Sequence, residues 1–169
     1  APAAAVAQAP AAAPTVDLAR EHSAALRASA QAQRASAQRL QAELDRIREA
    51  VVRRAMKQVG DAYAAGADGP DAFDCSGLTL FAWRAGGVEL PHYSVAQYKA
   101  TQRVSLRNAL PGDLAFYLEN GAHHVALYIG NGKVVHASDY GIGVVIGKVV
   151  GTPWNDAHFT GMGRVKVKA

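Results

Sequence analysis

The stretch HVALYIGNGKVVHAS, residues 124–138, joins two runs of β-branched and aromatic residues through a Gly-Asn-Gly turn. Such runs on either side of a short glycine-containing loop are typical of an antiparallel hairpin. The hairpin carries a histidine at each end, His124 and His136. The two imidazoles can act together only if they lie on the same face.

The answer depends on the length of the loop. A three-residue loop over 130–132 pairs Ile129 with Lys133. The same register pairs Ala126 with His136, which leaves His124 one diagonal step away on the same face. A two-residue loop would shift the register by one residue and put the histidines on opposite faces.

Outward from the hairpin, the chain changes character from helical to β. The segment 75–85 and a shorter one at 94–101 are expected to be helices, and Gly86-Gly87 ends the first. Further strands are expected at 113–118, 144–150 and 164–167. Helices followed by an antiparallel meander predict an α+β domain in which N-terminal helices pack on a five- to six-stranded sheet.

The first third of the chain has a different composition. All 12 aromatic residues lie between Tyr63 and Phe159, and all 16 glycines lie at or after Gly60. We expect an Ala/Pro-rich disordered tether over 1–15, a basic helical arm over 16–48 and the packed domain over 49–169. Only the last turns of the arm, 40–51, carry the apolar stripe that would pack on the domain.

Composition also limits the function. The formal charge of +4 arises from residues 1–57, with nine Lys/Arg against five Asp/Glu, whereas 58–169 has nine of each. A neutral domain argues against nucleic acid as a partner. No apolar run approaches the roughly 20 residues of a membrane span. An Ala/Pro-rich start without Met suits a mature exported protein, which we expect to be a monomer.

Cys75, the only cysteine, stands at the expected start of a helix between Asp74 and Ser76. There the helix dipole and free amides would stabilise a thiolate and lower its pKa. With His124 as base and His136 orienting it, the residues suggest acyl transfer. The same three residues could also hold zinc, although the spacing lacks paired close ligands.

Four motifs in this order, FDCSGLTLFAW (73–83), LPHYSVAQ (90–97), LPGDLAFY (110–117) and HVALYIGNGKVVHAS, closely resemble the NlpC family of cell-wall cysteine peptidases. The resemblance covers roughly residues 50–169. It implies a papain-like domain without a cofactor, in which Cys75 is the nucleophile, His124 the general base and His136 the residue that orients it.

The resemblance also implies the substrate and the location. Family members cleave amide bonds of peptidoglycan stem peptides, typically between D-γ-glutamyl and a diamino acid such as meso-diaminopimelate. This implies a secreted or periplasmic protein associated with the cell wall. A non-catalytic wall-binding module on the same fold is the alternative. Candidate oxyanion or substrate-binding residues are Tyr63, Asp74, Ser76 and Ser94; for Asp74 and Ser76, helix capping is an equally good explanation.

One segment departs from the family pattern. Tyr63 stands at the usual distance before the cysteine, but Ala62, Ala65 and Ala67 replace the family's Pro, Trp and second Gly. Ala65 supplies one methyl group where an indole would line the groove. The groove beside Tyr63 is therefore expected to be wider or filled from elsewhere, which would weaken the binding of short stem peptides.

Overall fold

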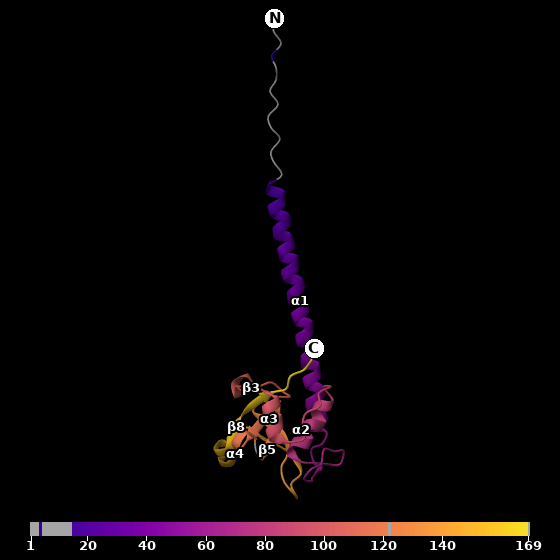
Figure 1. Ribbon diagram of the computed structural model, residues 1–169, viewed down its shortest axis with the longest axis vertical. Coiled ribbons are helices and arrows are strands. Elements are labelled where there is room, and N and C mark those ends of the chain that lie inside the picture. The colour runs from indigo at the N-terminus through magenta and orange to yellow at the C-terminus, as the bar shows by residue number, and fades with distance from the viewer. Residues whose placement is uncertain (1–3, 5–14, 122, 169) are drawn as a thin grey trace. The chain divides into compact units, whose positions relative to one another are not determined.

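A computed structural model describes residue 4, residues 15–121 and residues 123–168 (Figure 1). The tether expected over 1–15 lies almost wholly outside the described residues. The chain separates into two compact units, residues 1–41 and 42–169. No described helix is both long enough and apolar enough to cross a membrane.

The first helix, α1, runs Thr15–Met56 and is rich in Ala, Arg, Gln and Leu. Within the unit 42–169 its last turns contribute to the core: Val51 and Ala55 are fully buried, and Ile47 packs against them. Leu40, in the other unit, is 47% exposed. Within the unit 42–169, the predicted apolar stripe is thus in the core at Ile47 and Val51.

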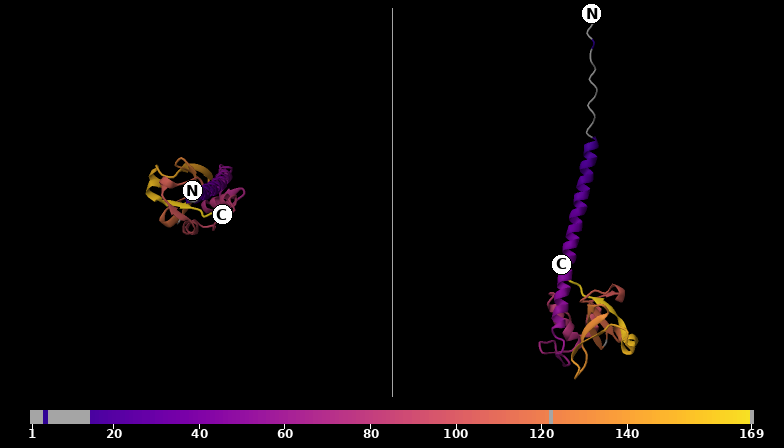
Figure 2. Two further views of the ribbon diagram at one scale, coloured as in Figure 1. Left: turned by 90° about the horizontal axis from the view of Figure 1, so that it is seen from above. Right: turned by 180° about the vertical axis from the view of Figure 1, so that it is seen from behind.

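The unit 42–169 contains a six-stranded sheet in which every neighbouring pair is antiparallel, with the strand order β3-β8-β4-β5-β6-β7. Figure 2 shows its later strands, in orange and yellow, on one side and the magenta helix α2 on the other. The predicted α+β fold is confirmed. The further elements are β1 (Ala62–Tyr63), β2 (Ala72–Phe73), α2 (Cys75–Arg84), α3 (Ser94–Ala100), β3 (Gln102–Val104), β4 (Leu114–Tyr117), β5 (His124–Gly130), β6 (Lys133–Ala137), β7 (Val144–Lys148), α4 (Pro153–His158) and β8 (Phe159–Arg164), with short 3₁₀ turns at Leu106–Asn108 and Glu119–Gly121.

The last strand differs from its prediction. β8 ends at Arg164, so residues 165–167 are not a strand. The cause is the length of its partners: β4 begins at Leu114, opposite Gly163, and β3 begins at Gln102, opposite Arg164. Beyond Arg164 no neighbouring strand offers hydrogen bonds, although Val165 is still buried in the core.

The sheet has two apolar faces. Val125, Leu127 and Val135 belong to the cluster that includes the buried side chains of α2, whereas Ala126 and Val134 belong to a second cluster. Side chains alternate along a strand, so the histidines of β5 and β6 share the face of the second cluster.

The register of the β5–β6 hairpin combines features of both predicted loops. Asn131 and Gly132 have φ values of 53° and 70° and form a two-residue turn that places Gly130 opposite Lys133. The predicted pairing of Ile129 with Lys133 is therefore wrong. A register shift between Tyr128 and Gly130 then restores the pairs expected nearer the histidines, beginning with Tyr128 opposite Val134.

A buried carboxylate connects α1 to the sheet. Asp113 is fully buried and receives hydrogen bonds from Arg48 (Nη1 to Oδ1, 3.1 Å) and Arg164 (Nη2 to Oδ2, 2.8 Å). The Leu110 amide donates to the same carboxylate. Arg48 is itself only 8% exposed, so both charges of this pair are removed from water.

We expect Asp113→Ala to lower the free energy of unfolding by about 3–5 kcal/mol, because it leaves the Arg48 guanidinium buried without its partner. Urea denaturation measures this loss. The control is Glu89→Ala, which removes an exposed carboxylate paired with Arg84 and should change the midpoint little. Equal midpoints for the two variants would show that the buried pair does not stabilise the domain.

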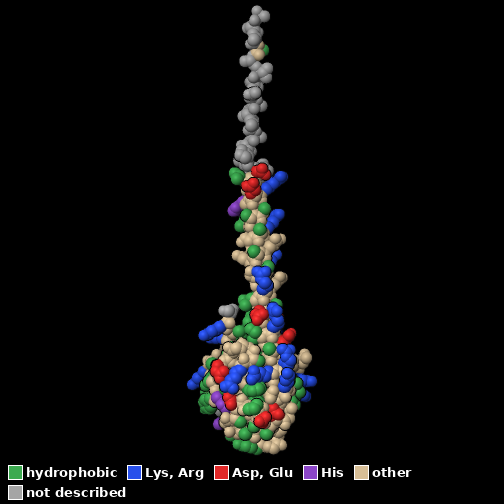
Figure 3. Space-filling model, turned by 90° about the vertical axis from the view of Figure 1, so that its right-hand side faces the viewer, with side chains coloured by type: hydrophobic (Ala, Val, Ile, Leu, Met, Phe, Trp, Pro, Cys, Tyr) green, Lys and Arg blue, Asp and Glu red, His purple; other side chains and the backbone are tan. Residues whose placement is uncertain are grey.

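Charges on the surface of the domain are mixed. On the face drawn in Figure 3, Lys and Arg side chains are mixed with Asp and Glu side chains on the surface of the domain. This face does not carry the continuous basic surface that a phosphate backbone would favour.

Candidate active site

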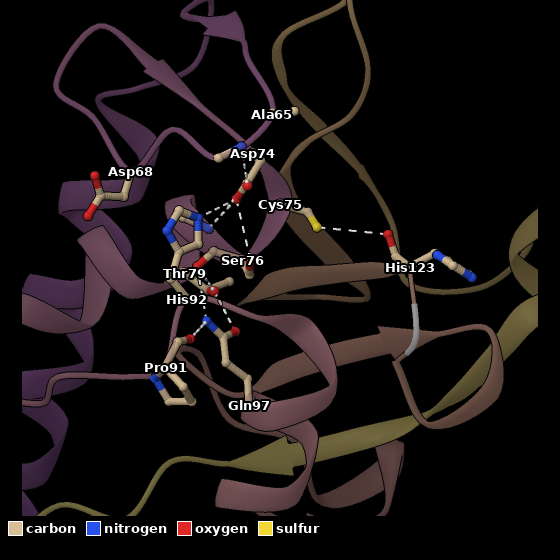
Figure 4. A network of polar contacts seen from close by, with 12 residues as sticks. Ala65, Asp68, Asp74, Cys75, Ser76, Thr79, Pro91, His92, Gln97 and His123 are labelled. Carbon is tan, nitrogen blue, oxygen red and sulfur yellow. Dashed lines mark hydrogen bonds and ion pairs between the residues drawn. The ribbon is translucent and has the colours of Figure 1, made fainter.

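Cys75 is the first residue of α2. Its half-buried side chain packs against the apolar cluster that includes the buried side chains of α2. Its Sγ lies 3.9 Å from the carbonyl oxygen of His123, and the Val125 amide points toward it as a hydrogen-bond donor. Figure 4 shows the sulfur directed at the His123 carbonyl. The thiol therefore lies beside the backbone on both sides of His124, where β5 begins.

Burial raises the pKa of the Cys75 thiol above its ordinary value, opposed by the amide of Val125 and by those of Ser76 and Cys75 itself. The nearby Asp74 carboxylate raises this pKa further. The expectation of a lowered thiol pKa at the helix N-terminus is thus wrong. Removal of the thiol from water outweighs the favourable amides.

Asp74 holds the start of α2 in place. Its Oδ1 accepts hydrogen bonds from the Gly77 amide (2.7 Å) and the Ser76 hydroxyl (3.3 Å), and its Oδ2 accepts one from the Gly66 amide (2.8 Å). His92 Nε2 lies 2.8 Å from Oδ1 (Figure 4). Asp74 is thus the N-cap of α2.

Gly77 allows a close approach at the same place. A Cβ at this position would lie 2.0 Å from the Ala67 carbonyl oxygen. Only glycine lets the loop around residue 67 pack so tightly on the first turn of α2, which explains the glycine in Asp-Cys-Ser-Gly.

A buried polar network supports the same turn from α3. The fully buried Gln97 donates to the carbonyl oxygens of Ser76 (3.0 Å) and Pro91 (2.8 Å) and accepts from Thr79 (2.7 Å). The sequence showed the motif LPHYSVAQ but did not indicate this role for its last residue. A glutamine among apolar residues in a short helix is the signal that could have suggested it.

Two of the four candidate substrate-binding residues are inaccessible. Ser76 and Ser94 are each 5% exposed, and the Ser76 hydroxyl donates to Asp74. Asp74 already accepts several hydrogen bonds from its own surroundings. Asp74 caps α2, Ser76 donates to that cap, and Ser94 begins α3 within the protein.

Tyr63 lies close to the thiol. Burial, followed by the charges of Cys75 and Asp74, raises the pKa of Tyr63, so its hydroxyl remains protonated at neutral pH. The ring packs edge-on against Tyr140, with 4.9 Å between ring centroids.

The space expected beside Tyr63 is occupied. The Ala65 amide donates to the Tyr140 hydroxyl over 3.2 Å, so a tyrosine from the loop after β6 stands next to the position of the missing indole. Tyr140 is 65% exposed and was not identified from the sequence.

His124 and His136 lie together as the register predicted. His124 Nε2 is 2.9 Å from His136 Nδ1, and the rings meet edge to face. Gly147 on β7 makes room for the second ring, since a Cβ there would lie 3.1 Å from His136 Nε2. One hydrogen is shared across this contact, so each ring determines the tautomer of the other.

Burial, reinforced by the neighbouring His136, lowers the pKa of His124 to about 3, and burial also lowers the pKa of His136. Both imidazoles are therefore neutral near pH 7. With the thiol pKa raised, the resting pair is a neutral thiol and a neutral imidazole rather than a thiolate and an imidazolium.

These shifts predict acid-sensitive stability. The unfolded chain binds protons at both histidines below about pH 6.5 while the folded protein does not, so stability falls as the pH drops from there toward 3. In urea unfolding, the free energy of unfolding should fall less between pH 7.5 and pH 5 for His136→Gln than for wild type. The exposed His22 on α1 provides the control, since His22→Gln should leave the slope unchanged. A wild-type stability that is flat over this range would contradict the prediction.

A cavity of about 530 Å³ opens beside the two histidines. His123 and His124 line it together with residues of β6, β7 and α4. Cys75 is not among its lining residues. The full lining is Tyr117, Leu118, His123, His124, Ala126, Val134, His136, Ser138, Asp139, Ile142, Gly147, Lys148, Trp154 and Asn155.

Within the described ranges 15–121 and 123–168, no three or more His, Cys, Asp or Glu side chains are arranged to hold a metal ion. The zinc arrangement considered for Cys75 and the two histidines is thus not formed in this part of the chain.

The family model described as the NlpC/P60 family matches residues 60–163, which include α2 and the histidine hairpin. The chain belongs to the NlpC/P60 family. Among NlpC/P60 relatives, it is 41% identical over 116 residues to the probable endopeptidase p60 of Listeria monocytogenes, covering 68% of this chain and 23% of that protein. It is 39% identical over 114 residues to the peptidoglycan endopeptidase RipA of Mycobacterium tuberculosis, covering 60% of this chain and 24% of RipA.

Solved NlpC/P60 structures have the same fold as this chain. The P60 domain of an antigen from M. avium subspecies paratuberculosis superposes with a TM-score of 0.64 at 30% identity, covering 74% of this chain and 98% of that one. The peptidoglycan hydrolase RipB of M. tuberculosis also gives 0.64, at 33% identity, covering 76% and 68%. The chain spans only about a quarter of the length of the curated relatives it matches.

Proposed function

We propose that this NlpC/P60 domain is a cysteine endopeptidase that hydrolyses amide bonds in peptidoglycan stem peptides, with Cys75 as nucleophile, His124 as general base and His136 as the residue that orients it. The observation that carries the proposal is the position of the thiol. Its sulfur lies against the backbone at residues 123 and 125, and the intervening His124 is hydrogen-bonded to His136.

The chemistry begins from the neutral pair. His124 accepts the thiol proton as Sγ of Cys75 attacks the carbonyl carbon, and the tetrahedral intermediate forms. The carbon–nitrogen bond then breaks, His124 returns the proton to the leaving amine, and a thioester remains. Water deprotonated by His124 adds to the thioester and releases the acid and the free thiol.

Two donors near the sulfur suit the developing oxyanion. The Cys75 amide opens α2, where backbone N–H groups have no partner within the helix. The Tyr63 hydroxyl, kept protonated by its raised pKa, is the second. Asp74, bound to its own helix and to His92, acts through the placement of Cys75.

The substrate bond we assign is that between D-γ-glutamyl and a diamino acid such as meso-diaminopimelate. The names of the relatives, endopeptidase and peptidoglycan endopeptidase, support this substrate class. A hydrolase of this polymer acts outside the cytoplasm, at the cell wall.

Digestion of purified peptidoglycan, with the fragments identified by mass, tests the function and the bond together. A thiol-alkylating reagent should stop release of peptides and a chelator should not. Binding to the wall with no release of peptides would replace the proposal with a wall-binding module, and inhibition by the chelator would indicate a metal site.

A further inference from the structure

The cavity beside the histidines lies on the opposite side of His124 from the thiol. His123 connects the two regions, because its carbonyl oxygen faces Sγ while the residue also lines the cavity. The volume of about 530 Å³ is within the usual range for a ligand site, about 300–1,000 Å³. It can therefore hold a residue of a bound peptide.

Under the proposed function, the direction of proton transfer determines which residue of the bound peptide occupies the cavity. His124 must protonate the leaving amine, so the amine leaves on the His124 side of the sulfur. The residue that follows the scissile bond then projects into the cavity, while the acyl part remains near Cys75 and Tyr63.

The rim of the cavity carries two opposite charges. Lys148 ends β7, and Asp139 lies in the loop that leads from β6 to β7. Both side chains are exposed, and they form no ion pair with each other or with other charged groups of the described chain. They are available to a ligand with a carboxylate and an ammonium group.

Part of the cavity lining is apolar. Trp154 of α4 is 47% exposed, and its ring centroid lies 6.5 Å from that of His124. The Asn155 side chain donates to the backbone carbonyl oxygen of Lys148 over 2.6 Å, which fixes α4 against the end of β7. An aliphatic side chain with charged groups at its far end fits this lining.

We infer that the cavity selects the residue after the scissile bond, that Lys148 binds a free carboxylate on its side chain, and that Asp139 binds its ammonium group. This inference rests on the proposed function and makes it more specific. The ligand is a residue that carries both groups, as a diaminodicarboxylic acid does. A lysine at the same place would use Asp139 alone.

The test compares two synthetic tripeptides, L-alanyl-γ-D-glutamyl-meso-diaminopimelate and the same peptide with L-lysine at the third position. Wild type should hydrolyse the first with the lower KM. Lys148→Ala should raise KM for it about ten- to hundredfold with little change in kcat, as expected for loss of a charge-assisted hydrogen bond. The KM of Lys148→Ala for the lysine peptide should stay close to that of wild type.

Asp139→Asn should raise KM for both peptides, because both carry the ammonium group. The matched control is Lys133→Ala, which removes the exposed lysine paired with Lys148 across the β6–β7 ladder but not lining the cavity. It should behave as wild type. Lys148→Arg should retain most of the preference for the diaminopimelate peptide.

The outcomes separate the two proposals. If wild type cleaves neither peptide and releases nothing from peptidoglycan, the proposed function fails. If wild type cleaves both with equal KM, or if Lys148→Ala and Lys133→Ala are indistinguishable, hydrolysis stands and the role of Lys148 is overturned.

Discussion

Cys75→Ala is expected to abolish release of peptides from peptidoglycan while leaving the fold intact. Without the sulfur no thioester forms, and the neighbouring groups have no nucleophile to activate. The exchange removes one atom from a half-buried site, so the free energy of unfolding should change little. Mass analysis of the digest and a thermal melt measure the two effects.

The single thiol makes this prediction sharp. Alkylation of a thiol in the folded protein reports on Cys75 alone, because the chain has no other cysteine. Because its pKa is raised, the alkylation rate should still be increasing with pH above the thiol's ordinary value of 9.0. Loss of activity should follow loss of the free thiol one to one. Retained turnover at more than a few per cent in Cys75→Ala would exclude it as the nucleophile.

His124→Ala should be nearly as severe, with a loss of about 10²–10⁴-fold in kcat, the usual contribution of a general acid–base. His136→Ala should cost less, because it removes the partner that holds the base rather than the base itself. For Nδ1 of His124 to accept a proton from the thiol, Nε2 must carry hydrogen and donate it to His136 Nδ1, which the 2.9 Å separation permits.

Rescue distinguishes positioning from a merely structural role. His136→Gln keeps an acceptor for the His124 ring and should recover much of the activity lost in His136→Ala. The dependence of kcat on pH should shift in the alanine variant, since burial beside the second imidazole lowers the pKa of His124. Full activity in His136→Ala would mean that another residue orients His124, and equal loss in both variants would contradict a role through the hydrogen bond.

Local pattern was enough to predict the fold class and part of the candidate site. Glycine and proline punctuation separated the helices from the strands, and the residues before Cys75 marked it as the first of a helix. Alternation along β5 and β6 predicted that the histidines share a face in the register of a three-residue loop. These features depend on residues close together in the chain, where period and capping preference act directly.

The register of the β5–β6 hairpin could not be predicted from local pattern alone. Both loop lengths were plausible, and the chain uses the shorter one with a bulge near Ile129 that restores the register of the longer. The histidines are brought together by this compensation. A bulge is stabilised by the neighbouring strands and by the twist of the sheet, which a hairpin sequence alone does not contain.

The sequence by itself determined the α+β fold and the helix that begins at Cys75, because each follows from local spacing, but it left the shared face of His124 and His136 open until the bulge fixed the register. The tertiary structure decided that Tyr140 stands beside Ala65, that burial raises rather than lowers the pKa of the thiol, and that Lys148 and Asp139 meet at one cavity. The physical reason is that neighbours, burial and cavities arise from packing between segments distant in the chain, and the pattern within each segment does not specify which other segment it will contact.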